Sequence, residues 1–402
     1  MKKVFAKVMI LLIGFSNGII YGQCSTSYSL PVGTEPYSIT FSPDGSLLAT
    51  ANNENSVSLF SVTGSTLNLE SAFPAGTNFG VSVRSIVFSP DGSLLAVSSY
   101  WSDKVALYGV SGNTLSGPDI YPLPNPGGDQ PVSIAFSPIG NILATANSDS
   151  KDVTLFGVVG GNLTSLGNFP IPVGASGDPG VPRSIAFSPD GTFFAVTGDA
   201  EESCGFGCTD YSQKDYIATY NSTDLSTDTF DLPQPLNKLR GLGSMAFSAD
   251  GSFLAVLTGF SDVPLESPNQ AIVIFLVNGD QLTDPATIYV SRDDAGGDIA
   301  ISPDGSLFAL PNDRGQYVSP HTITLIPLGM DPFSASLPDG GERPNSIAFS
   351  PDGTLLVTAN EGSDDVSLFD VDCVLNGGGE SGDGDGDGST AAHLPMMFSP
   401  LI

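Results

Sequence analysis

Basic and metal-binding side chains are scarce in this chain of 402 residues. Lys and Arg together number 13 against 43 Asp and Glu, which gives a formal net charge of −30. A chain this acidic is a poor partner for nucleic acid or an anionic membrane surface, because both carry charge of the same sign. Histidine occurs only as His321 and His393, and cysteine only four times. We therefore expect no metal site and no cofactor.

Long hydrophobic runs are lacking beyond the N-terminus, so we expect no membrane span. At the N-terminus, three lysines precede the short apolar stretch Val8–Phe15, and Gly22 is a small residue that suits cleavage. This pattern is typical of a secretory signal peptide over residues 1–22. A membrane anchor is the alternative, but Ser16 soon interrupts the apolar run. We expect a secreted, periplasmic or cell-surface protein.

What the chain does contain is one phrase repeated seven times. Its clearest copy, Ser346–Phe369, begins Ser-Ile-Ala-Phe-Ser-Pro-Asp-Gly. The copies lie 47 to 60 residues apart and are anchored by the apolar residue before the turn phrase: Phe41, Phe88, Phe136, Phe187, Phe247, Ile301 and Phe349. A repeat of this length indicates stacked supersecondary units.

Each repeat predicts four short strands, which in the first copy are Ser38–Ser42, Leu47–Ala51, Val57–Val62 and Leu67–Phe73. The first strand alternates apolar and polar residues, whereas the second and third are nearly continuously apolar, as in strands covered on both faces. Ser-Pro-Asp-Gly between the first two strands predicts a tight turn, in which glycine takes a positive φ.

Four-stranded antiparallel sheets repeated seven times predict an all-β fold, a seven-bladed β-propeller. An open solenoid is the alternative, and the termini decide between the two. The last copy has no fourth strand, while Ser27–Val32 precedes the first copy as an extra strand. We predict that this N-terminal strand joins the last blade and closes the ring. The propeller would span residues 23–374, and a Gly/Asp-rich flexible tail would follow over 375–402.

Four cysteines in an exported chain predict two disulfides. Cys24 and Cys373 flank the two strands that ring closure would pair, so we predict a bond between them. Cys204 and Cys208 would then form a local bridge in the insertion Asp199–Asp215. A metal site at that pair lacks nearby ligands to complete a tetrahedral set.

The basic residues should gather on one face of the ring. Loops that enter inner strands and loops between second and third strands emerge together, opposite the Ser-Pro-Asp-Gly turns. These loops hold all ten basic residues that follow the signal peptide: Arg84, Lys104, Lys151, Arg183, Lys214, Lys238, Arg240, Arg292, Arg314 and Arg343. They either pair with carboxylates of the same loops, or form a site in which Arg84 and Arg183 meet an anion at the central channel.

The repeat resembles two propeller families. The Phe-Ser-Pro-Asp-Gly phrase with a following Val-x-Leu-Phe strand is similar to the WD40 repeat, but the Gly-His and Trp-Asp signatures of that family are missing. Gly33–Pro36 and the pairs Ala51-Asn52, Ala146-Asn147 and Ala359-Asn360 resemble the YVTN-type repeats of bacterial lactonase-like propellers. That second resemblance implies lactone chemistry by His, Arg and Glu at the channel mouth, yet neither histidine clearly reaches the channel.

The sequence favours a non-enzymatic, monomeric binding module for a protein, glycan or small anionic ligand. Its candidate ligand-binding residues are Arg84, Arg183, Arg240, Arg343, Asn52, Asn147 and Asn360. A protein partner would be indicated by an exposed patch near Tyr100 and Trp101. The alternative is a lactonase-like hydrolase acting on a sugar lactone or related molecule. There Arg84 and Arg183 would hold the carbonyl or carboxylate, and Asp199 or Glu361 would activate water.

Overall fold

The structure is a computed structural model of the whole chain. It describes residues 24–31, 34–75, 79, 82–125, 128–172, 180–199, 216–231, 242–258, 270–290, 297–312, 321–329, 332–338 and 341–377. The predicted signal peptide, the Cys204–Cys208 bridge and residues 378–402 lie outside these ranges.

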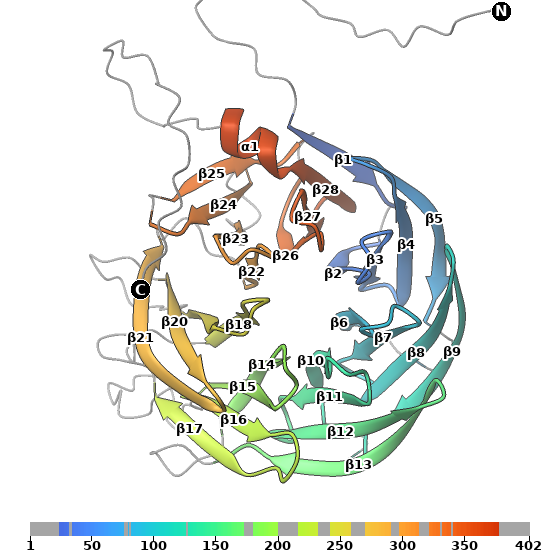
Figure 1. Cartoon of the computed structure of the whole chain (residues 1–402). Helices are drawn as coiled ribbons and strands as arrows, with labels where there is room; N and C mark the ends of the chain where they lie inside the picture. The colour runs from blue at the N-terminus through green and yellow to red at the C-terminus, as the bar shows by residue number, and fades with distance from the viewer. Residues whose placement is uncertain are drawn as a thin grey trace, which may run out of the picture.

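The chain forms a seven-bladed β-propeller, as predicted, with four antiparallel strands in each blade (Figure 1). Blade one is β2 (Pro36–Phe41), β3 (Leu47–Asn52), β4 (Ser56–Val62) and β5 (Leu67–Pro74). Blade two is β6 (Val83–Phe88), β7 (Leu94–Ser99), β8 (Lys104–Ser111) and β9 (Thr114–Pro122). Blade three is β10 (Pro131–Phe136), β11 (Ile142–Asn147), β12 (Asp152–Val159) and β13 (Asn162–Pro170). Blade four is β14 (Val181–Phe187), β15 (Phe193–Asp199), β16 (Tyr216–Asn221) and β17 (Thr227–Asp231).

The remaining blades complete the ring, in which the first strand of every blade lies nearest the centre, here called the central channel (Figure 1). Blade five is β18 (Leu242–Phe247), β19 (Phe253–Thr258), β20 (Gln270–Asn278) and β21 (Gln281–Val290). Blade six is β22 (Ala300–Ile301), β23 (Leu307–Asn312), β24 (Thr322–Pro327) and β25 (Phe333–Ser336). Blade seven is β26 (Pro344–Phe349), β27 (Leu355–Asn360), β28 (Asp365–Asp370) and β1 (Ser25–Ser29).

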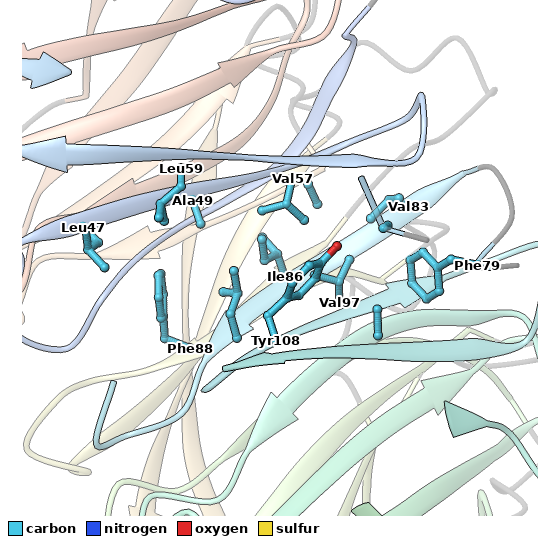
Figure 2. Close-up of a cluster of buried hydrophobic side chains, with 14 residues drawn as sticks. Leu47, Ala49, Val57, Leu59, Phe79, Val83, Ile86, Phe88, Val97 and Tyr108 are labelled. Carbon is cyan, nitrogen blue, oxygen red and sulfur yellow. The ribbon is translucent and has the colours of Figure 1, made fainter. Parts of the chain in front are cut away.

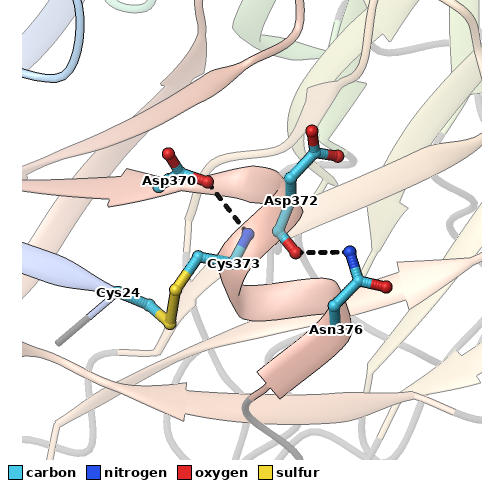
Figure 3. Close-up of a disulfide and its surroundings, with 5 residues drawn as sticks. All are labelled: Cys24, Asp370, Asp372, Cys373 and Asn376. Carbon is cyan, nitrogen blue, oxygen red and sulfur yellow. Dashed lines mark hydrogen bonds between the residues drawn. A yellow bond between two sulfur atoms is a disulfide. The ribbon is translucent and has the colours of Figure 1, made fainter. Parts of the chain in front are cut away.

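The N-terminal strand closes the ring, as the sequence predicts. Strand β1 pairs with β28 in antiparallel register, although it begins at Ser25, two residues before the predicted start. Cys24 and Cys373 form the predicted disulfide, with a Cα–Cα distance of 5.4 Å (Figure 3). The bond joins residues 349 positions apart. In the unfolded state it closes a loop that contains nearly all of the propeller, and so it lowers the conformational entropy of that state.

A short helix, α1 (Val371–Gly377), carries Cys373 and was not predicted. The Asp370 carboxylate accepts a hydrogen bond from the Cys373 amide, at 2.9 Å, and so caps the first turn (Figure 3). Val371 and Val374 are buried against blades six and seven. The glycines that follow made this helix of seven residues unrecognisable in the sequence.

The hydrophobic core lies between neighbouring blades. The second strands are buried along nearly their whole length, as β3 and β23 show without a break, and third strands such as β28 are buried except at one end. Figure 2 shows the cluster between blades one and two, which includes Leu47, Ala49, Val57, Leu59, Ile86, Phe88, Val97 and Tyr108. Burial of each large apolar side chain contributes about 1.5–3 kcal/mol. Because these side chains are buried between blades, each blade is stabilised mainly by its contacts with the neighbouring blades.

The Ser-Pro-Asp-Gly turns define one face of the ring, here called the turn face. In blade one, Asp44 Oδ1 accepts hydrogen bonds from the Ser42 hydroxyl at 2.7 Å and the Ser46 amide at 3.0 Å. Gly45 has φ +71°, as the turn requires. Blade three has Ile139 in place of aspartate, and there the Ser137 hydroxyl donates to Asn141 Oδ1 instead, at 2.9 Å.

Candidate functional site

The opposite side, called the mouth face, carries a repeated β-bulge where the inner strands begin. The pairing register shifts between Pro36 and Ser38 in blade one, and at the equivalent position in blades two, three, four, five and seven. A bulge re-aims side chains, so two consecutive residues of an inner strand face the channel. Tyr37 with Ser38 and Arg84 with Ser85 are such pairs.

These side chains enclose a pocket of about 400 Å³ at the mouth of the channel. Its upper ring is formed by the first of the two consecutive residues in each blade: Tyr37, Arg84, Val132, Arg183, Gly243, Gly297 and Asn345. Its lower ring is formed by the next residue of each blade: Ser38, Ser85, Ser133, Ser184, Ser244, Asp298 and Ser346. Each blade therefore contributes one residue to each ring. The positions at which the residue type differs between blades determine which polar and charged groups line the pocket.

Arg84 is held between two aromatic rings. Its guanidinium carbon lies 4.5 Å from the centre of the Tyr37 ring, across the blade junction, and 5.2 Å from the centre of the Tyr100 ring. Such cation–π contacts fix the side chain without neutralising its charge. The buried Nε atom of Arg84 has no hydrogen-bond partner among the described residues. Because Nε is shielded from solvent, the terminal guanidinium nitrogens are the donors that a ligand in the pocket could meet.

The lower ring links blades through serine side chains. The Oγ atoms of Ser85, Ser133 and Ser184 accept the main-chain N–H of Ile134, Ile185 and Met245 in the next blade, at 3.2 to 3.3 Å. A hydroxyl that accepts in this way keeps its own O–H for donation. Together with Arg84 and Arg183, blades two to four thus present hydrogen-bond donors to the channel.

Asp298 replaces serine in blade six and is the only carboxylate among the described residues that line the pocket. Its Oδ2 atom accepts from the Ser346 hydroxyl at 2.8 Å and from the Ile347 amide at 3.1 Å. Burial raises the pKa of Asp298 above its ordinary value, although these hydrogen bonds oppose the shift. The pocket therefore has donors on one side and a single acidic group on the other.

The three candidate asparagines lie inside the blades. Asn52, Asn147 and Asn360 are fully buried at the ends of β3, β11 and β27. In each, the side-chain oxygen accepts from a threonine two residues earlier, and the amide nitrogen donates to side chains on the neighbouring strand. These contacts account for the repeated Ala-Asn pair as a clamp between the second and third strands.

The remaining candidates lie outside the pocket or outside the described residues. Arg343 forms an ion pair with Glu361, at 2.9 Å, and Glu361 also accepts from the Asn345 amide at 2.6 Å. Asp199 ends β15, but its side chain lies outside the description, as does the whole of Arg240. Of the other predicted basic residues, Lys104 and Lys151 are described at the start of third strands on the mouth face.

The two histidines do not add to the site. His321 is buried before β24 of blade six, where its Nδ1 atom has no partner among the described residues, and His393 lies outside the description. Among the residues described, no group of three or more His, Cys, Asp or Glu side chains is placed to hold a metal ion. No helix within the described ranges is long and apolar enough to cross a membrane.

Comparison with known proteins supports the fold and both predicted resemblances. Residues 71–178 match the family model for the lactonase seven-bladed β-propeller. Residues 22–61 and 337–370 match the model for the WD domain, G-beta repeat. No curated protein matches the chain. The protein is thus a seven-bladed β-propeller with lactonase-like and WD40-like repeats.

Three solved structures illustrate how widely this architecture is shared. Hydrazine synthase of Kuenenia stuttgartiensis is similar with a TM-score of 0.64 and 18% identity, over 89% of this chain and 99% of that one. The Cps50 (Swd1) β-propeller domain of Myceliophteria thermophila gives 0.63 and 12%, over 86% and 99%. A putative 6-phosphogluconolactonase from Bacteroides uniformis gives 0.56 and 17%, over 75% and 82%. At these identities the likeness concerns the fold alone.

Proposed function

We propose that the protein is an exported binding module that holds a small anionic ligand at the mouth of its central channel. The observation that carries this proposal is Arg84, whose guanidinium carbon lies against the Tyr37 and Tyr100 rings at a pocket that Arg183 also lines. Planar guanidinium groups suit carboxylate or phosphate, which accept two parallel hydrogen bonds. The serine hydroxyls of blades two to four supply further donors to the same anion.

Export is supported by the N-terminal charge and hydropathy pattern and by the disulfide between Cys24 and Cys373. Disulfides form and persist in oxidising compartments. A protein outside the cytoplasm meets small acids and glycans more often than charged intracellular metabolites, and the pocket volume of about 400 Å³ suits a single small unit.

Calorimetric titration of the mature protein with acetate, gluconate and glucuronate tests the proposal. Arg84→Ala and Arg183→Ala should each weaken binding of the preferred anion about tenfold or more, because each removes a charge-assisted hydrogen bond. Arg343→Ala is the matched control, since Arg343 belongs to the mouth face but pairs with Glu361 outside the pocket. No binding across the panel, or equal losses in all three variants, would overturn the proposal.

Lactone hydrolysis is the second candidate, and Asp298 is the observation that favours it. A carboxylic acid with a raised pKa faces the same pocket as two arginines, an arrangement that suits a water-activating base and donors for a developing oxyanion. Asp298 lines the pocket and Glu361 does not, so Asp298 is the better placed base. Turnover of glucono-δ-lactone that Asp298→Asn abolishes would support hydrolysis; turnover equal to buffer in the wild type would exclude it for this lactone.

A further inference from the structure

A second hollow lies beside the channel mouth on the same face. It has a volume of about 600 Å³ and is lined by Glu35, Asn53, Glu54, Ser82, Arg84 and Trp101. Arg84 lines both this outer hollow and the channel-mouth pocket. One guanidinium therefore lies at the border of two adjacent spaces.

Trp101 gives the outer hollow an apolar wall. It is the single tryptophan of the chain, stands in the turn between β7 and β8, and is 63% exposed. Its ring meets the Tyr100 ring at 87° with 4.8 Å between centres. Since Tyr100 also contacts Arg84, the Trp101 indole, the Tyr100 ring and the Arg84 guanidinium form a chain of contacts from the outer hollow to the channel mouth. An exposed indole supplies a large, rigid contact surface at little cost in side-chain entropy.

The polar groups around this indole are mixed in kind. The Asn53 side-chain amide donates to Glu35 Oε2 at 3.2 Å, while Glu54 offers acceptors, Arg84 offers donors and Ser82 can do both. The lining holds two glutamates against one arginine, so a second acidic group would be repelled. A neutral ring with an apolar face and several hydroxyls matches the whole set, because each hydroxyl both donates and accepts. That combination describes a sugar.

We propose that the outer hollow is a second subsite that binds a neutral sugar ring, so that the ligand is an acidic saccharide of at least two units. Its acidic unit occupies the channel mouth between Arg84 and Arg183, and its neutral neighbour stacks on Trp101. This inference rests on the proposed function, because the acidic unit uses the same arginines.

Calorimetry with three probes separates the two subsites: glucuronic acid, cellobiose, and the disaccharide in which glucuronic acid is linked to glucose. We expect the acidic disaccharide to bind the wild type about tenfold or more tightly than glucuronic acid does, and cellobiose to bind weakly. Trp101→Ala should remove this gain and leave the affinity for glucuronic acid unchanged. Trp101→Phe, which keeps an aromatic face, should restore part of the gain.

The control variant is Ile139→Ala, which truncates a 74% exposed side chain on the turn face and should change no affinity. Equal affinities of glucuronic acid and the disaccharide for the wild type would overturn the second subsite and leave the proposed function standing. Loss of glucuronic acid binding in Trp101→Ala would also overturn it, because the subsites would then not be separate. If neither acidic probe binds, both proposals fail for acidic sugars.

Discussion

On the turn face, the positive-φ residue of every blade is a glycine, with φ between 70° and 73°. On the mouth face, the same backbone region is occupied by larger side chains that precede inner strands: Glu35, Ser82, Gln130 and Arg343. Their carbonyls accept hydrogen bonds from the residue after the second strand of the same blade, for example from Asn53 to Glu35 at 3.0 Å. Non-glycine residues in this region cost energy and are often found where function fixes a conformation.

The two faces also shift the pKa of acidic side chains in opposite directions. On the turn face, the side-chain hydrogen bond from the neighbouring serine is the main cause that lowers the pKa of Asp44, Asp91 and Asp352. On the mouth face, burial raises the pKa of Asp298. A repeated, fully satisfied turn serves stability, whereas one half-buried acid in a ring of serines departs from the repeat and suggests a role in binding. Three substitutions would test this contrast.

The largest effect should come from Gly353→Ala on the turn face. The residue has φ +73°, and an added Cβ would lie 3.3 Å from Cδ of Pro303 in the preceding blade. We expect a loss of about 2 kcal/mol in the free energy of unfolding, measured by urea titration, and no change in ligand affinity. Gly112→Ala is the control, because Gly112 has φ +55° with nothing within 4 Å of the added atom. An equal loss in both variants would show that the close contact between residue 353 and Pro303 of the preceding blade does not affect stability.

A smaller effect should follow Asp91→Ala, which removes the acceptor for the Ser89 hydroxyl at 2.6 Å and the Ser93 amide at 3.0 Å. We expect a loss of about 1 kcal/mol at pH 7. Because the folded-state pKa of Asp91 is lowered, its contribution is present above the ordinary value of 3.8 and is lost as the pH falls through the folded-state value. The difference between wild type and variant in urea titrations should therefore shrink below about pH 4.

Asp91→Asn is the matched control for that experiment. The amide keeps one oxygen acceptor for Ser89 and Ser93 but cannot titrate in this range. It should retain most of the stability at pH 7 and show no loss on acidification that is attributable to residue 91. A difference between wild type and Asp91→Ala that stays constant from pH 7 to pH 3 would contradict the assigned pKa direction.

The fold could be predicted in detail because the same structural sequence features recur in each blade. The glycine of the turn phrase requires a positive φ, the apolar second strand requires cover on both faces, and the unpaired first strand requires a partner at the other terminus. The pairing of Cys24 with Cys373 followed from that closure. Helix α1 was missed because one hydrogen bond, from the Cys373 amide to Asp370, stabilises its first turn just before a glycine-rich segment.

The site was only partly predictable, since its contacts cross blade junctions. Arg84 and Arg183 were named as candidates from their place before the inner-strand serine, but the contact of Arg84 with Tyr37 joins two different repeats and could not be read from the sequence. Asn52 was also named as a candidate ligand residue, and the structure shows its side chain hydrogen-bonded within the blade. Asp298 was overlooked, although alignment of the seven copies at the serine position would have exposed it. In a repeat protein, the departures from the repeat point to the site.

Asp298→Ser should have the smallest effect on stability and is the sharpest test of the contrast between the faces. Serine at this position can accept the Ile347 amide as Ser184 accepts that of Met245, so we expect a change within about 0.5 kcal/mol at pH 7. The folded-state pKa of Asp298 is raised, so its contribution is present below 3.8 and is lost as the pH rises through the folded-state value. Urea titrations between pH 4 and pH 8 should therefore show a wild-type decline that the serine variant lacks. A loss of about 1 kcal/mol or more at pH 7 would instead make Asp298 a structural link between blades, comparable in its contribution to the turn-face aspartates.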